Sequence, residues 1–257
     1  MNKVKIEGVY LEYCWYGETT DKNLTIVMLH EGLGCVGLWK QFPEQLAQHT
    51  GCRVLAYSRQ GYGGSAPVKP PRSLKYMHRE GIEVLPLLLD ALSIDKVLLF
   101  GHSDGASIAL IFAGSQQDER LRGLILLAPH VFNEEKCVES ITLARQAYET
   151  GRLREQLMNY HGSNVDGAFW GWNKAWLDAD FWFWNLEEYL ATIKVPLLII
   201  QGEDDEYGTF AQIEAIQAQV LTQTTVEVLS DCKHSPHRDQ PQTVLELSEQ
   251  FVQQLPV

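Results

Sequence analysis

A strand-like run that ends in a Gly-x-Ser-x-Gly motif is the feature that most constrains the fold of this chain. Residues 97–100 are all apolar, and the motif at residues 101–105 follows at once, before small and apolar residues at helical spacing. A sharp turn from a strand into a helix needs small residues on both sides, and Gly101 and Gly105 meet this need. The pattern places the hydroxyl of Ser103 at the apex of the turn and predicts that it is a nucleophile.

Short β-rich runs alternate with helical patterns along most of the chain. The runs predict strands over residues 4–13, 24–30, 53–58, 96–101, 121–128, 196–201 and 225–229. Helices are expected over residues 39–49, 74–92, 104–114, 210–221 and 242–254. Several strands are apolar throughout, which is typical of a parallel sheet covered by helices on both faces. We therefore predict a doubly wound α/β fold that binds its ligand at the carboxyl ends of the strands.

The segment from residue 130 to residue 191 carries no strand pattern and interrupts this alternation. Amphipathic helical patterns cover residues 134–148 and 152–160, and a cluster of aromatic residues follows them. We expect residues 130–191 to form a helical cap, and residues 1–129 and 192–257 to form the core domain. Most of the aromatic side chains are expected to pack the cap onto the body. A few are predicted to line an apolar substrate pocket, namely Trp170, Trp172 and Trp176.

Composition disfavours several classes of partner. The 257 residues include 21 basic and 33 acidic side chains, for a net charge of -12, whereas nucleic acids and anionic membranes select a basic face. No apolar run reaches the roughly 18 residues of a membrane span, and the N-terminus lacks the hydrophobic segment of a signal peptide.

The five scattered cysteines include no Cys-x-x-Cys pair, which favours reduced thiols in a cytoplasmic protein. We predict neither a nucleic-acid nor a membrane partner, and the oligomeric state stays unknown.

A serine hydroxyl becomes nucleophilic beside a general base, and that base needs an acid to fix its tautomer. The acid is expected just after a strand downstream of Ser103. Asp205 comes third after Gly202, which follows the predicted strand ending at residue 201, and Asp204 is the alternative.

The base is expected after the last strand. His234 comes first there, whereas His237 is expected to face solvent or the next helix. His161 is expected at the surface or partly buried. No pair of histidines has metal-ligand spacing on one element, so we predict no metal site.

Acyl transfer also needs backbone N–H groups that point at the oxyanion. Asp104, directly after the predicted nucleophile, is expected to supply one of them from the start of its helix. The loop after an early strand is expected to supply the other, from Gly32 or alternatively from Leu33.

The same loop also matches a different fingerprint. Gly32-x-Gly34-x-x-Gly37 is the spacing of a dinucleotide-binding loop, and Arg59 after the next strand suits a 2′-phosphate. An NADP-dependent oxidoreductase is therefore an alternative, but it leaves the serine, acid and base candidates without a role.

Taken together, five motifs in this order resemble the α/β-hydrolase superfamily over nearly the whole chain. They are His30-Glu31-Gly32-Leu33-Gly34, Ser58-Arg59-Gln60-Gly61-Tyr62-Gly63-Gly64-Ser65, Gly101-His102-Ser103-Asp104-Gly105, Gly202-Glu203-Asp204-Asp205 and His234-Ser235-Pro236-His237-Arg238-Asp239-Gln240-Pro241. The resemblance implies a mostly parallel eight-stranded sheet, a triad of Ser103, His234 and Asp205, oxyanion donors at Gly32 and Asp104, and no cofactor. The chain departs from the usual pattern at Glu31, where glycine is common, and at Ser58, where an acid is common.

The resemblance leads us to expect a serine hydrolase that cleaves a small to medium carboxylic ester or thioester. Epoxide hydrolases and dehalogenases of this superfamily normally need Asp at the nucleophile position, and Ser103 argues against both. A C–C bond hydrolase of dienone acids is the enzymatic alternative. It would need basic residues for the substrate carboxylate, and the cap offers Arg145, Arg152, Arg154 and Lys174. A non-catalytic binding module on the same fold is a third class.

Overall fold

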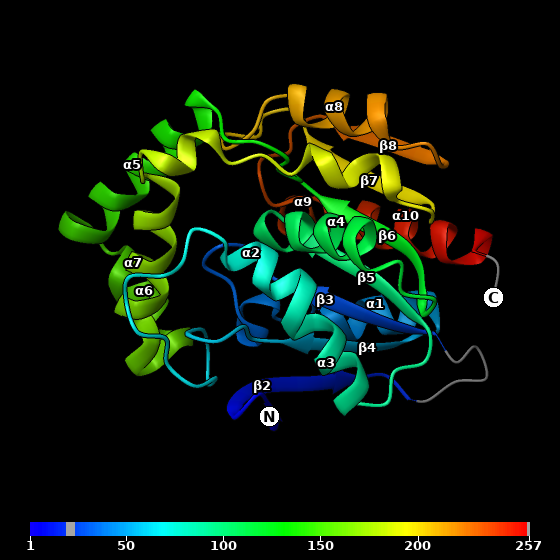
Figure 1. Cartoon of the computed structure of the whole chain (residues 1–257), viewed down its shortest axis with the longest axis horizontal. Helices are drawn as coiled ribbons and strands as arrows, with labels where there is room; N and C mark the ends of the chain where they lie inside the picture. Colours follow the sequence, from blue (N-terminus) through cyan, green and yellow to red (C-terminus); the bar gives the residue numbers. More distant parts are fainter. Residues whose placement is uncertain (19–23, 256–257) are drawn as a thin grey trace.

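The computed structural model describes residues 1–18 and 24–255, and a single eight-stranded sheet runs through it (Figure 1). The strands are β1 (Asn2–Ile6), β2 (Val9–Tyr16), β3 (Thr25–Leu29), β4 (Arg53–Tyr57), β5 (Val97–His102), β6 (Leu121–Leu127), β7 (Leu197–Gly202) and β8 (Thr224–Leu229). Their order across the sheet is β1-β2-β4-β3-β5-β6-β7-β8. Strand β2 pairs antiparallel with β1 and β4, and every later pair is parallel. The predicted fold class is therefore confirmed.

Helices cover both faces of this sheet. Helices α1 (Phe42–Thr50) and α10 (Pro241–Gln254) pack on one face. The other face is covered by α3 (Leu85–Ala91), α4 (Asp104–Gln116) and α8 (Ala211–Gln219). Successive side chains of a strand point to opposite faces, so a strand buried on both sides has to be apolar throughout. This explains the continuous apolar runs of β3, β5 and β7.

Two predicted elements are divided in the structure. The strand expected over residues 4–13 is β1 and β2, because Glu7 and Gly8 turn the chain with φ of 47° and 86°. The helix expected over residues 74–92 consists of α2 (Tyr76–Arg79), a π-helical turn η2 (Glu80–Val84) and α3. The remaining short helices are η1 (Val36–Trp39), η3 (Gly162–Asn164), η4 (Asp180–Phe183), η5 (Glu187–Thr192) and α9 (Pro236–Asp239). No helix within residues 1–18 and 24–255 is long and apolar enough to cross a membrane.

Three longer helices lie between β6 and β7. They are α5 (Glu135–Thr150), α6 (Leu153–His161) and α7 (Val165–Trp176), and Figure 1 shows them grouped together to one side of the sheet. Their inward side chains belong to the same apolar cluster as α4 and β5. Aromatic rings also pack against one another within the inserted segment: Tyr148 stacks on Phe169 with centroids 3.6 Å apart, and Trp176 meets Trp184 edge-on at 5.4 Å.

Candidate active site

The turn at Ser103 has the tight geometry that its flanking glycines predict. Ser103 lies between β5 and α4 with φ 54° and ψ −118°, a conformation that L-residues rarely adopt. A Cβ added at Gly105 would lie 1.9 Å from the carbonyl oxygen of Leu29, and one at Gly101 would lie 2.5 Å from that of Gly105. The N–H of Ser103 donates to the carbonyl oxygen of Leu127 on β6 (2.9 Å). The sheet thus holds the serine in strained backbone at its carboxyl edge.

Three residues far apart in the sequence meet at this edge. Nε2 of His234, which follows β8, lies 2.9 Å from Oγ of Ser103. Nδ1 of the same ring lies 2.9 Å from each carboxylate oxygen of Asp205, which follows β7. A carboxylate can only accept, so Nδ1 carries the proton and Nε2 is free to accept one from the serine hydroxyl.

The pKa values of the acid and the base move in opposite directions. Burial alone would raise the pKa of Asp205, but the charge and the hydrogen bond of His234 outweigh burial and hold that pKa below its usual range. Burial alone would lower the pKa of His234, yet the carboxylate of Asp205 outweighs it and raises the pKa above the ordinary value. The pair therefore favours an anionic acid beside a basic imidazole.

The two alternative residues lie elsewhere. Asp204 is exposed, and its backbone N–H donates to the carbonyl oxygen of Cys232 at 2.9 Å. His237 does not face solvent: it is 4% exposed, and its ring lies 4.8 Å from that of Trp39 and 5.6 Å from that of Phe42. His237 was expected to face solvent or the next helix, and instead the rings of Trp39 in η1 (Val36–Trp39) and Phe42 in α1 cover it.

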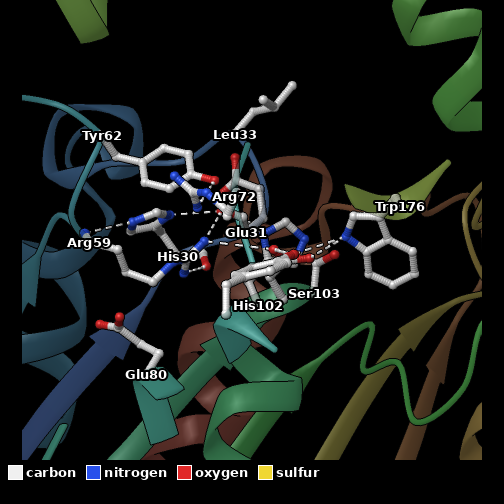
Figure 2. Close-up of polar contacts among 12 residues, drawn as sticks. His30, Glu31, Leu33, Arg59, Tyr62, Arg72, Glu80, His102, Ser103 and Trp176 are labelled. Carbon is white, nitrogen blue, oxygen red and sulfur yellow. Dashed lines mark hydrogen bonds and ion pairs between the residues drawn. The ribbon is translucent and has the colours of Figure 1, made fainter. Parts of the chain in front are cut away.

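The loop after β3 is fixed from several sides. Arg59 donates to the carbonyl oxygens of His30 and Glu31, the latter at 2.9 Å (Figure 2). The side chain of Glu31 accepts from Arg238 at 3.2 Å, so the residue that departs from the usual pattern ties this loop to α9. Gly32 and Leu33 therefore belong to a loop whose backbone is held by side chains of other elements.

The inserted helices also hold this loop. His161 is 2% exposed rather than superficial, which corrects the expectation for it. Its Nδ1 accepts from the N–H of Gly63 (3.0 Å), so its Nε2 donates to the carbonyl oxygen of Leu33 (2.9 Å). Gly32 is covered by the indole of Trp172, since an added Cβ would lie 2.1 Å from Nε1. This cover and the burial of Arg59 disfavour the dinucleotide-binding alternative.

The carboxylate of Asp104 is fully buried beside the predicted nucleophile. It accepts from the hydroxyl of Tyr76 and from the indole nitrogen of Trp176, the latter at 3.2 Å. Nη2 of Arg59 lies 3.9 Å away. Burial raises the pKa of Asp104, and the charge of Arg59 opposes this rise. The backbone N–H of Asp104 belongs to the first turn of α4, where N–H groups have no partner within the helix.

The three tryptophans singled out in the sequence are in different surroundings. Trp172 and Trp176 are 6% and 2% exposed and face the loop after β3 and the carboxylate of Asp104, respectively. Trp170 is half-buried and lines a groove with Pro71 and Lys174 that Ser103 does not border. The assignment of all three to a substrate pocket stays a prediction, and the contacts favour Trp172 and Trp176.

The basic residues considered for a substrate carboxylate are engaged with the inserted helices. Arg145 lies 3.8 Å from Glu149, Arg152 lies 3.8 Å from Glu155, and Arg154 lies 2.7 Å from Asp166. Lys174 lies over the ring of Trp170. With these partners, the four side chains do not support the C–C bond hydrolase alternative, which needs a basic group for the substrate carboxylate.

Several residues at the site went unnoticed in the sequence. Tyr76 reaches Asp104 from α2, and His130, three residues after the end of β6, places its ring 5.5 Å from that of His234. Burial, reinforced by the neighbouring His234, lowers the pKa of His130 to about 3. The position of His130 after a strand was the one available signal, because ligands gather at these strand ends. Among the described residues, no group of three His, Cys, Asp or Glu side chains is arranged to hold a metal ion.

Comparisons with known proteins identify the family. The model of the Alpha/beta hydrolase family matches residues 26–247, so the chain belongs to this family. A proline iminopeptidase of Lactobacillus helveticus is 24% identical over 240 residues, which cover 79% of this chain and 81% of that protein.

Two solved structures share the fold over nearly their whole length. MGS-M2, an α/β-hydrolase enzyme from a Medee basin deep-sea metagenome library, superimposes with a TM-score of 0.79 at 18% identity and covers 100% of this chain and 98% of its own. A thermophilic esterase of Thermogutta terrifontis has a TM-score of 0.74 at 19% identity, with 98% of both chains covered. At such identities the likeness establishes the fold and not the substrate.

Proposed function

We propose that this protein is a serine hydrolase that cleaves a small to medium carboxylic ester or thioester through an acyl-enzyme on Ser103. The observation that carries the proposal is the unbroken relay from Asp205 through His234 to Ser103, with 2.9 Å at each step. In this mechanism His234 takes the proton of Ser103 while Oγ attacks the carbonyl carbon. The protonated imidazole then gives that proton to the leaving alcohol or thiol. Water, activated by the same base, releases the acid and restores the serine.

The charge that develops on the carbonyl oxygen needs N–H donors. We infer that Asp104 supplies one from the start of α4 and that the loop after β3 supplies the other. Gly32 is favoured over Leu33 as the donor. Arg59 donates a hydrogen bond to the carbonyl oxygen of Glu31, and this bond fixes the peptide plane that also contains the N–H of Gly32. Preorganised donors of this kind stabilise the tetrahedral intermediate without reorganising during the reaction.

We infer that residues 130–191 act as a cap over this site and that Trp172 and Trp176 contribute to its apolar lining. Both rings are buried in the apolar cluster that connects the inserted helices to the sheet. A lining of this kind favours an uncharged acyl group, since a charged one would lose its hydration without gaining a partner.

Peptide-bond cleavage is the second candidate, because the similar Lactobacillus helveticus protein is a proline iminopeptidase. An enzyme that binds a free amine at the scissile residue would need a carboxylate beside the nucleophile. Asp104 is the carboxylate adjacent to Ser103 in the sequence, and protein donors already occupy both of its oxygens. Because these oxygens already accept hydrogen bonds from the protein, the site favours ester hydrolysis over peptide-bond cleavage.

A fluorophosphonate probe and a substrate panel test the proposal together. The probe should label Ser103 in the wild-type protein and leave Ser103→Ala unlabelled, while the two proteins unfold at nearly the same temperature. p-Nitrophenyl esters of increasing acyl length and the corresponding acyl thioesters should be hydrolysed by the wild type alone. Faster turnover of proline p-nitroanilide than of every ester would assign the protein to the peptidases instead. Ester hydrolysis that persists in Ser103→Ala would refute the nucleophile.

A further inference from the structure

Two buried side chains outside the triad connect the segments that carry the proposed oxyanion donors. Arg59 follows β4 and is 2% exposed, and Asp104 begins α4 and is 0% exposed. Nη2 of Arg59 lies 3.9 Å from Oδ2 of Asp104. A buried ion pair costs hydration on both sides, so it persists where further hydrogen bonds hold the two groups in place.

Arg59 holds the loop after β3 at three points, and Figure 2 shows its side chain beside His30 and Glu31. The guanidinium donates to the carbonyl oxygens of His30 and Glu31, and the backbone N–H donates to Nε2 of His30 at 3.1 Å. In a planar trans peptide the carbonyl and the following N–H point in opposite directions. A fixed carbonyl at Glu31 therefore fixes the direction of the next N–H, which is the proposed donor.

Asp104 holds the other donor segment. Its carboxylate accepts from Tyr76 on α2 and from Trp176 on α7, while its own backbone N–H is the second proposed donor. A buried carboxylate would also repel the negative charge that develops on the substrate oxygen. The guanidinium of Arg59 offsets that repulsion, because a nearby opposite charge acts strongly where water is excluded.

We propose that Arg59 and Asp104 form a charge-paired brace that sets the two halves of the oxyanion hole relative to one another. Both side chains have a positioning role, since they act by orienting backbone amides, that of Asp104 included, and do not touch the substrate themselves. The inference rests on the proposed function of Ser103 and assigns a role to two side chains that the triad does not need. It also explains why this chain tolerates an acid directly after its nucleophile.

Conservative variants test the brace. Arg59→Lys keeps the positive charge but loses the fork that reaches two carbonyl oxygens and the carboxylate at once. Asp104→Asn removes the negative charge at nearly constant volume. Arg72→Lys is the control, because Arg72 is a half-buried arginine nearby that donates to the hydroxyl of Tyr62 and the carbonyl of Gln60 and to neither carbonyl oxygen that Arg59 holds. Tyr76→Phe keeps both charges and removes one hydrogen bond from Asp104, so it serves if either charge variant fails to fold.

The first measurement compares turnover of p-nitrophenyl butyrate with inhibition by phenylboronic acid, which forms a tetrahedral adduct on a serine. Arg59→Lys and Asp104→Asn should each lower kcat about 10- to 100-fold, with KM changed less than about threefold. Phenylboronic acid should bind more weakly by the same factor as kcat falls. The double variant should be no worse than the poorer single one, because removing either partner already releases the brace. Tyr76→Phe should show a smaller loss, of about two- to fivefold, in the same direction.

The second measurement is hydrogen exchange of the backbone over residues 28–36, which needs no activity. Exchange should be faster in Arg59→Lys than in the wild type and unchanged in Arg72→Lys. Unchanged exchange overturns the brace, and so does an unaltered affinity for phenylboronic acid or a multiplicative loss in the double variant. A wild type that fluorophosphonate does not label would refute the proposed function instead, and the exchange result would still decide the brace.

Discussion

The indole nitrogen of Trp176 donates to both the hydroxyl of Tyr76 (3.0 Å) and the carboxylate of Asp104 (3.2 Å). This shared hydrogen bond connects α7, among the inserted helices, to the residue directly after the predicted nucleophile. The packing of the inserted segment and the order of the active-site backbone are therefore coupled through one side chain.

Trp176→Phe removes this N–H while keeping most of the aromatic volume. We expect it to lower the free energy of unfolding by about 1–3 kcal/mol, because a buried carboxylate loses one of its donors. Urea unfolding measures the change. Trp182→Phe is the control, because Trp182 is 49% exposed and its substitution should stay within about 0.5 kcal/mol. Equal effects of the two substitutions would show that the hydrogen bond contributes nothing.

Asp205→Asn should lower kcat by about 10³- to 10⁴-fold, because an amide in place of the carboxylate favours the wrong tautomer of His234. Asp204→Asn, one residue away and exposed, should stay within about twofold of the wild type. Steady-state kinetics on the best ester of the panel compares them. A larger loss in Asp204→Asn would transfer the role of the acid to that residue.

Hydrolysis should fall at acid pH, since His234 acts as a base only when it is neutral. Asp205 raises the pKa of His234, so the acid limb of kcat/KM should have its midpoint above the ordinary histidine value of 6.5. The residual activity of Asp205→Asn should show this limb at lower pH, because the charge that stabilises the imidazolium is gone. Activity that increases below pH 5 would contradict His234 as the base.

Acid should also weaken the fold through His130. The pKa of this residue is about 3 in the folded protein and 6.5 in an unperturbed chain, so below pH 6.5 the unfolded chain binds a proton that the folded one does not. The free energy of unfolding should then fall by up to about 1.4 kcal/mol per pH unit between pH 6 and 4 from this residue alone. Urea unfolding at several pH values should give a flatter slope for His130→Gln.

The sequence predicted the fold well because the strands of this sheet are long apolar runs with helices between them. The prediction of one strand over residues 4–13 was wrong, because Glu7 and Gly8 turn the chain within a run that alternates like a single strand. Helix α7 lies within the segment expected to be helical, but its bounds were not predicted, because its aromatic residues were interpreted as packing and pocket residues and their helical spacing was not used.

The predicted site residues were found from motif order, since Ser103, Asp205 and His234 each follow a strand. Arg59, Tyr76 and His161 were not predicted as parts of the site, although Arg59 had been noted in another role. Their contacts depend on how the loop after β4 and the inserted helices pack, which no local pattern encodes. Asp104 was noticed, but its partners could be identified only in three dimensions.

The approach of α4 to β3 at Gly105 has a consequence for laboratory evolution of this protein. A mutant library that varies this position would consist mostly of clones that do not fold, because any side chain meets the carbonyl of Leu29. Substitutions are better directed at the outward faces of α5 and α6, which contact neither the turn at Ser103 nor the hydrogen-bonded chain from Asp205 to Ser103. Substitutions there can change the surface of the inserted segment while the reactive centre is left unaltered.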